Sequence, residues 1–320
     1  MKQSYRLVIA GAALLCCWTM IATGPAAATG RTVAVMSGEP RFGVALPGAP
    51  SDMAELQNYT DTMHRAPELV TWYEHWGFDS DFPAVAAGRV AATGAVPEVT
   101  WMPWNPAVGV TDPAYTLDSI TAGAHDAYIR RWARQIRAYR QPIVLRFAHE
   151  MNGSWYPWGD GVNGNGPGDY VTAWRHVRAV FTVMGAENVT WKWSPNVLTS
   201  SGALESVYPG DRFTDQVGLD GYNWGGTQSW SSWQSLWQVF GPSVADVRSF
   251  TSRSLFIAET GCTEVGGNKA AWITDMFATL AGHPEIRGFT WFNYDKETDW
   301  RIQSSQRSLD SFRRGLTTYA

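Results

Sequence analysis

Residues 142–150 read PIVLRFAHE, an apolar run that ends in a histidine and a glutamate. A run this rich in β-branched and aromatic residues is typical of a strand buried on both faces, as in parallel sheets. Residues 254–259 read SLFIAE and repeat the arrangement, because a carboxylate again ends an apolar run. The two segments therefore predict parallel strands whose C-terminal ends carry polar groups at one edge of a sheet.

Eight runs of this kind occur along the chain, and each is separated from the next by a stretch long enough for a helix. Eight apolar strands that alternate with helices predict an α/β fold, the (β/α)8 or TIM barrel. No Gly/Ser-rich or Pro-rich linker interrupts residues 29–320, so we expect a single domain there. The predicted strands cover residues 41–46, 69–73, 96–103, 142–149, 188–193, 216–222, 254–259 and 288–294.

The expected helices between these strands are amphipathic or apolar segments. The clearest is 122–139, where Ile129, Trp132, Ala133, Ile136 and Tyr139 fall on one face at helical spacing, opposite a row of arginines. Such a helix is expected to cover a barrel with its apolar face. The predicted helices cover residues 51–63, 122–139, 169–184, 231–240 with a continuation toward Phe250, 268–281 and 308–319.

The N-terminal segment has the pattern of a secretory signal peptide. Lys2 and Arg6 precede an apolar run that is too short for a membrane-spanning helix, and small residues follow it. We expect cleavage after Ala28, which makes residues 1–28 the signal and 29–320 a secreted catalytic domain with no membrane segment. A lipid anchor on Cys17 is the weaker alternative, because Cys16 stands where a small residue is needed.

Composition excludes some functions and favours one. The chain has 25 basic and 29 acidic residues, and its densest basic cluster, within 130–140, is spaced like the solvent face of a helix, so we expect no nucleic acid partner. Its 18 tryptophans stand out, and flat apolar rings suit the faces of sugars. Cys262 is expected to be a buried packing residue. No zinc-type spacing or Gly-rich phosphate loop occurs, so we expect no cofactor and no metal ion, and a monomeric protein.

The two strand-end carboxylates, Glu150 and Glu259, indicate the chemistry. Charged groups at the edge of an apolar core are costly unless they are paired, solvated or used. Hydrolysis of a glycosidic bond needs one carboxyl group that is protonated and one that is ionised. The alternative is that each glutamate is a salt-bridged residue of the barrel. We favour catalysis because both lie where barrel enzymes place their reacting groups.

The segment RFAHEMNGSWYPWG at residues 146–159 resembles the acid/base segment of glycoside hydrolase family 26, and IAETG at 257–261 resembles its nucleophile strand. The resemblance extends over nearly the whole chain after the predicted signal. It implies a (β/α)8 barrel and a retaining mechanism, with Glu150 as acid/base and Glu259 as nucleophile. It also implies that His149 contacts substrate and that Tyr222 hydrogen-bonds the nucleophile.

The remaining candidate residues surround this pair. Arg146 is expected either to add positive charge beside the nucleophile or to support the site structurally. By resemblance, Trp291 would form the floor where the bond breaks, and Trp155 and Trp158 would line the loop after Glu150 and bind substrate. Trp101 and Trp104, at the end of a predicted strand, could be sugar platforms or core residues. Helical spacing favours a packed face for three further tryptophans, Trp230, Trp233 and Trp237.

The family acts on several β-glycans, and the sequence leaves the substrate open. Many mannanases of the family carry a Trp-Trp pair after the acid/base segment, whereas this chain has Tyr156-Pro157-Trp158. We therefore expect an endo-acting hydrolase of either β-1,4-mannan or mixed-linkage β-1,3-1,4-glucan. The alternatives are a transglycosylase that acts on the host's own exopolysaccharide and a noncatalytic carbohydrate-binding protein.

Overall fold

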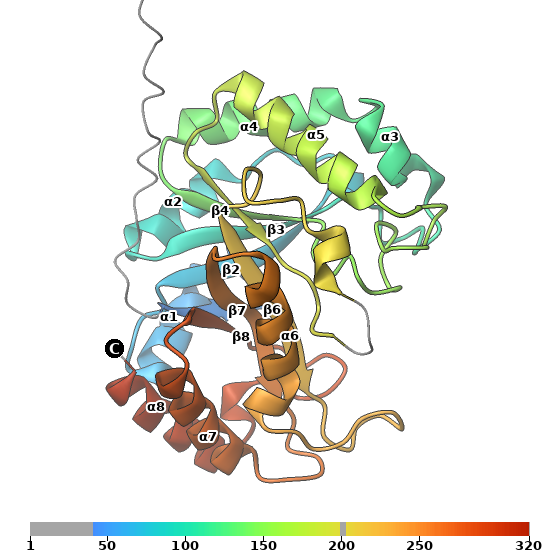
Figure 1. Ribbon diagram of the computed structural model, residues 1–320. Coiled ribbons are helices and arrows are strands. Elements are labelled where there is room, and N and C mark those ends of the chain that lie inside the picture. The colour runs from blue at the N-terminus through green and yellow to red at the C-terminus, as the bar shows by residue number, and fades with distance from the viewer. Residues whose placement is uncertain (1–40, 199–202, 320) are drawn as a thin grey trace, which may run out of the picture. The chain divides into compact units, whose positions relative to one another are not determined.

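A computed structural model describes residues 41–198 and 203–319 (Figure 1). Eight parallel strands form a closed barrel in which every strand pairs with its neighbours in sequence and β1 pairs with β8. This confirms the predicted (β/α)8 barrel. The predicted signal peptide lies outside the described residues. The strands are β1 (Arg41–Ala45), β2 (Leu69–His75), β3 (Val96–Met102), β4 (Ile143–Phe147), β5 (Val189–Trp193), β6 (Gln216–Asn223), β7 (Ser254–Cys262) and β8 (Ile286–Phe292).

Helices cover the outside of the strands. Five predicted helices are confirmed within a few residues at their ends, whereas α2 and the short α3 were not predicted. No helix among the described residues is long and apolar enough to cross a membrane. The helices are α1 (Met53–Met63), α2 (Ala84–Ala92), α3 (Leu117–Thr121), α4 (Asp126–Tyr139), α5 (Asp169–Met184), α6 (Leu236–Phe250), α7 (Lys269–Gly282) and α8 (Gln306–Thr318).

The expectation of a helix over residues 231–240 was wrong in its first half. Helix α6 begins only at Leu236, where Ser235 and Gln238 form a capping box. The preceding residues are held as a loop, because the Asn223 side chain accepts hydrogen bonds from the backbone N–H groups of Gly225 and Gln234. A side chain that satisfies these N–H groups stabilises the loop in place of a helical turn.

Between the strands and the helices lies an aromatic core, whereas the inside of the barrel is partly polar. On the outside, Trp101 stacks on Trp132 of α4 at 4.9 Å between ring centroids. On the inside, Lys192 Nζ lies 2.6 Å from Glu98 Oε1, and both side chains are almost completely buried. Thr71 donates to the second oxygen of Glu98. The charges within the barrel are therefore paired, as burial requires.

Candidate active site

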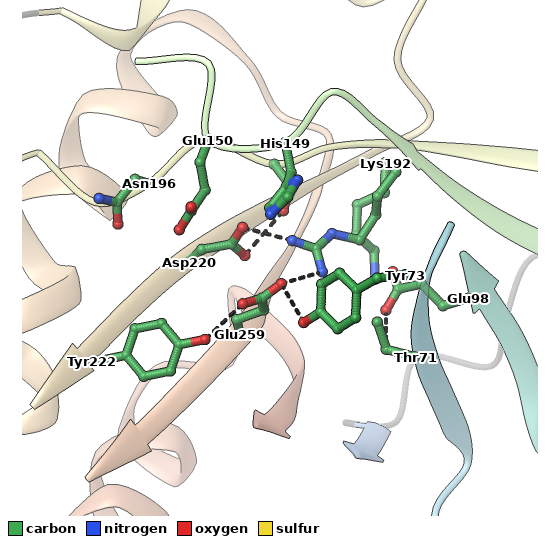
Figure 2. Close-up of polar contacts among 12 residues, drawn as sticks. Thr71, Tyr73, Glu98, His149, Glu150, Lys192, Asn196, Asp220, Tyr222 and Glu259 are labelled. Carbon is green, nitrogen blue, oxygen red and sulfur yellow. Dashed lines mark hydrogen bonds and ion pairs between the residues drawn. The ribbon is translucent and has the colours of Figure 1, made fainter. Parts of the chain in front are cut away.

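The carboxylate of Glu259 is held by three donors at the C-terminal end of the barrel (Figure 2). The Tyr222 hydroxyl donates to Oε2 at 2.6 Å, and the Tyr73 hydroxyl donates to Oε1 at 2.8 Å. Arg146 Nη1 donates to the same Oε1 at 2.9 Å. Burial raises the pKa of both tyrosines well above the ordinary value, and Glu259 raises it further, so both hydroxyls stay protonated donors. These contacts fix the orientation of the Glu259 side chain.

Arg146 connects the carboxylate to a second acid. Its Nη2 donates to Asp220 Oδ2 at 2.6 Å, and Arg146 and Asp220 are both fully buried. The pairing of β6 with β7 shifts register between Leu219 and Asp220, and the pairing of β7 with β8 shifts on either side of Ile257. Irregularities of this kind re-aim side chains beside active sites. They bring the Asp220 and Glu259 side chains to one guanidinium.

The Glu150 carboxyl lies in a different environment. Among the described residues its one side-chain hydrogen-bond partner is Trp155, whose Nε1 donates to Oε2 at 2.7 Å. Burial raises the pKa of Glu150 to about 7, the charge of Glu259 adds to the rise, and the bond from Trp155 opposes it. At neutral pH a substantial fraction of Glu150 is therefore protonated, whereas Glu259 accepts hydrogen bonds from the three donors named above. Two neighbouring carboxyl groups in unlike environments are what acid and nucleophile roles require.

The backbone that presents Glu150 adopts an uncommon conformation. Ala148 has φ of 47° and Glu150 has φ of 54°, both in the left-handed region that side chains with a Cβ rarely enter. Two hydrogen bonds to neighbouring strand ends hold this turn: Ala148 N donates to Trp101 O, and Glu150 N donates to Ser194 O at 2.7 Å. Strain maintained by the surrounding structure is typical of functional sites.

The two carboxyl groups line a cleft of about 1010 Å³ at the mouth of the barrel. His149 and Trp158 illustrate its construction. The His149 ring lines the cleft, and burial lowers its pKa well below the ordinary value, so it is neutral. Its Nδ1 has no hydrogen-bond partner among the described residues. Trp158 is fully buried and donates to the His149 backbone carbonyl at 2.6 Å. Aromatic and polar side chains together line the cleft, as in many sugar sites.

The sequence of residues 72–282 matches the family described as Glycosyl hydrolase family 26. The chain belongs to glycosyl hydrolase family 26. Endoglucanase H of Acetivibrio thermocellus is 36% identical over 273 residues, which are 83% of this chain but 29% of that protein. The mannan endo-1,4-β-mannosidase A and B of Caldalkalibacillus mannanilyticus is 36% identical over 86 residues, 25% of this chain and 16% of that protein. A family 26 β-mannanase structure from Bacteroides ovatus superposes with a TM-score of 0.64 at 19% identity, covering 87% of this chain and 88% of that one.

Most of the residues predicted for this family 26 site lie together. Glu150, Glu259, His149, Trp155, Tyr222 and Trp104 all line the cleft. Arg146 lies beneath it and contacts Glu259, so both functions expected of it, charge and structural support, occur together. The Trp158 ring does not line the cleft, so the expectation that it does was wrong. Tyr156 lines the cleft instead, and its ring stacks on the Trp158 ring with centroids 4.5 Å apart.

Of the two alternatives left open for Trp101, the structure shows the core residue, and the expectation that Trp291 faces substrate was wrong. Side chains alternate between the two faces of a strand. On β3, Glu98 faces the barrel interior, and Met102, on the same side of the strand, lines the cleft. Trp101 lies on the opposite side and therefore faces α4. On β8, Phe292 lines the cleft, so its neighbour Trp291 points outward and packs near Phe312 of α8 at 5.4 Å. Both tryptophans are fully buried.

Sequence reasoning missed several cleft residues. Tyr73 ends an aromatic-rich predicted strand. It lies on the same side of that strand as Thr71, two residues earlier, and this alternation was the available signal. Sequence reasoning also gave no role to Asp220, which lies two residues before Tyr222, is fully buried and bonds Arg146 without lining the cleft. Trp300 also lines the cleft and packs on Tyr222, with ring centroids 4.9 Å apart. Trp300 lies beyond β8 in a loop, which no strand pattern could have placed.

The cluster of His149, Asp220 and Glu259 brings three ligand atoms within 4.8 Å of one another. Such a cluster could hold a cation if its charge were uncompensated. Here the guanidinium of Arg146 already contacts both carboxylates, and it would compete with a metal ion. The arrangement therefore fits a carboxylate held by fixed donors better than a metal centre.

Proposed function

We propose that the chain is a retaining endo-β-glycanase in which Glu150 is the acid/base and Glu259 the nucleophile. The observation that carries this proposal is the unlike environment of the two carboxyl groups, one raised in pKa to about 7 and one bound by Arg146, Tyr73 and Tyr222. Protonated Glu150 donates to the leaving oxygen while Glu259 attacks the anomeric carbon. Water, activated by the ionised Glu150, then hydrolyses the glycosyl-enzyme.

We propose a β-glucan as the substrate, with mixed-linkage β-1,3-1,4-glucan first. Support comes from the similarity to endoglucanase H, which spans 83% of this chain. β-1,4-Mannan is the second candidate, supported by the shorter match to a mannan endo-1,4-β-mannosidase. The neutral His149, whose Nδ1 has no partner in the part of the chain that the structure describes, would form a hydrogen bond with a sugar hydroxyl in either case.

Reducing-sugar release from the two polymers, measured side by side, tests this function. We expect release from mixed-linkage glucan that exceeds release from mannan and that disappears in both Glu150→Ala and Glu259→Ala. A preference for mannan would correct the substrate only. A folded wild-type protein that is silent on both polymers would contradict the hydrolase and favour a carbohydrate-binding protein or an enzyme of the host's own exopolysaccharide.

The activity should fall as pH rises through about 7, because the reaction needs the protonated form of Glu150. The bond from Trp155 favours the carboxylate, so Trp155→Phe should raise the Glu150 pKa and move the basic limb of kcat/KM upward by up to about one pH unit. Trp104→Phe is the matched control, since Trp104 lines the cleft without bonding Glu150. A limb that stays in place or moves downward in Trp155→Phe would contradict this role.

We also propose that residues 1–28 export the chain, on the support of the basic residues, apolar run and small residues described above. The protein recovered from the culture medium of a producing cell should begin at Thr29, as measured by mass spectrometry of its N-terminal peptide. Protein that stays inside the cells with residues 1–28 intact would exclude export by this segment.

A further inference from the structure

The loop between β6 and α6 displays a tryptophan at the rim of the cleft. The Trp230 side chain is 70% exposed, although it belongs to the cleft lining. Its ring contacts Trp224, with centroids 5.5 Å apart, and Trp224 contacts Trp300 at 4.8 Å. Trp300 in turn packs on Tyr222, which bonds Glu259. A continuous series of aromatic rings thus leads from the nucleophile to an open face at the rim.

The loop that carries Trp230 is fixed to the barrel. The side-chain oxygen Oδ1 of Asn223 accepts hydrogen bonds from two backbone N–H groups of the loop, and Ser231 Oγ donates to Gly225 O at 2.7 Å. Gly225 has φ of 51°, and a Cβ there would lie 2.0 Å from Val265 O, so only glycine fits this close approach. A ring on such a loop loses little conformational freedom when it binds a ligand.

Trp233, three residues later, shows that the exposure of Trp230 is not a general property of the loop. The Trp233 ring packs against Gly267, where an added Cβ would lie 2.2 Å from it. Trp233 therefore anchors the loop, whereas the Trp230 ring meets Trp224 with 61° between the ring planes and has most of its surface in water. A large apolar ring at the rim of a cleft is stabilised when a ligand covers it and removes its surface from water.

We infer that Trp230 is the platform of an outer sugar subsite, which binds a ring of the β-glycan remote from the bond that breaks; this inference rests on the proposed function. All substituents of a β-linked glucose ring are equatorial, so both its faces present C–H bonds that fit an indole. Neutral polar side chains line the same cleft and are exposed in it, namely Ser232, Gln234 and Gln238. Amides and hydroxyls of this kind bind sugar hydroxyls without a charge.

The test compares kcat/KM on a trisaccharide and a hexasaccharide of the polymer that the wild-type protein cuts, for Trp230→Ala and the wild type. We expect Trp230→Ala to reduce kcat/KM roughly tenfold on the hexasaccharide and to leave kcat/KM on the trisaccharide unchanged. Binding energy from a remote sugar ring raises kcat/KM only when the substrate is long enough to reach Trp230. Trp230→Phe, which keeps a flat ring, should recover most of the loss.

Trp237→Ala is the matched control, because Trp237 is 38% exposed, stacks on His283 and does not line the cleft. It should behave as the wild type at both lengths. Equal activity of Trp230→Ala and wild type at both lengths would overturn the subsite, as would an equal loss at both. If the wild type cuts neither polymer, the proposed function fails by itself. Calorimetric binding of the glucan hexasaccharide then decides the subsite, which is overturned if Trp230→Ala binds as tightly as wild type.

Discussion

Glu259→Ala is expected to reduce the rate of polysaccharide hydrolysis roughly 10⁴-fold or more, because no other group replaces the attacking carboxylate. The substitution also leaves Arg146, Tyr73 and Tyr222 without their shared acceptor, so their donors would face the vacated space. Added azide is small enough to enter there. It should restore turnover of an activated aryl glycoside and give the α-glycosyl azide, since it attacks from the side that Glu259 occupied.

The control for this variant is Glu264→Ala. Glu264 follows the same strand, but it bonds Ser304 and Ser308 and does not line the cleft. Its removal should leave hydrolysis within about twofold of wild type, as expected for a substitution outside the reacting groups. Comparable losses in the two variants, or a β-glycosyl azide from Glu259→Ala, would mean that Glu259 is not the nucleophile.

Glu150→Ala is expected to reduce the rate of polysaccharide hydrolysis about 10²- to 10⁴-fold, because the sugar oxygen that leaves departs only when it is protonated. An aryl glycoside with an acidic phenol needs no such proton, so its first step should remain close to the wild-type rate. Removal of the glycosyl group by water still needs a base, and a rapid burst of phenol should precede a slow steady state. Stopped-flow release of the phenol measures both phases.

The two leaving groups act as controls for one another in the same variant. Equal losses on polysaccharide and aryl glycoside, with no burst, would indicate that Glu150 supports the structure of the site rather than transferring the proton. Azide should rescue the second step of Glu150→Ala and give the β-glycosyl azide, the opposite configuration to that expected from Glu259→Ala. The pair of products therefore separates the two roles.

The barrel could be predicted from the sequence because each strand is recognisable from its own residues alone. Each strand is a short apolar run, and two of the runs end in the carboxylates that the structure brings to one cleft. Helix α4 was equally clear, since its buried face repeats at helical spacing. Helix α2 was missed because its sequence, AVAAGRVAA, has small residues on most sides and little contrast between faces.

The tryptophans were harder, because their position depends on strand parity and loop path. Trp101 and Trp104 are three residues apart, and the structure buries the first behind β3 and brings the second into the cleft. The pattern at Trp230 and Trp233 indicated a packed helix face, whereas hydrogen bonds from Asn223, a residue that the pattern ignores, keep that segment a loop. A periodicity judged over a few neighbouring residues cannot reveal hydrogen bonds from a side chain outside them.

The stereochemistry of the first product tests the account most directly. Proton NMR of the newly formed reducing end, recorded in the first minutes of hydrolysis of mixed-linkage β-glucan or mannan, distinguishes the anomers before they equilibrate. The β-anomer is expected first, because attack by Glu259 and then by water inverts the configuration twice. Initial accumulation of the α-anomer would require a single displacement by water and would contradict the role of Glu259 as nucleophile.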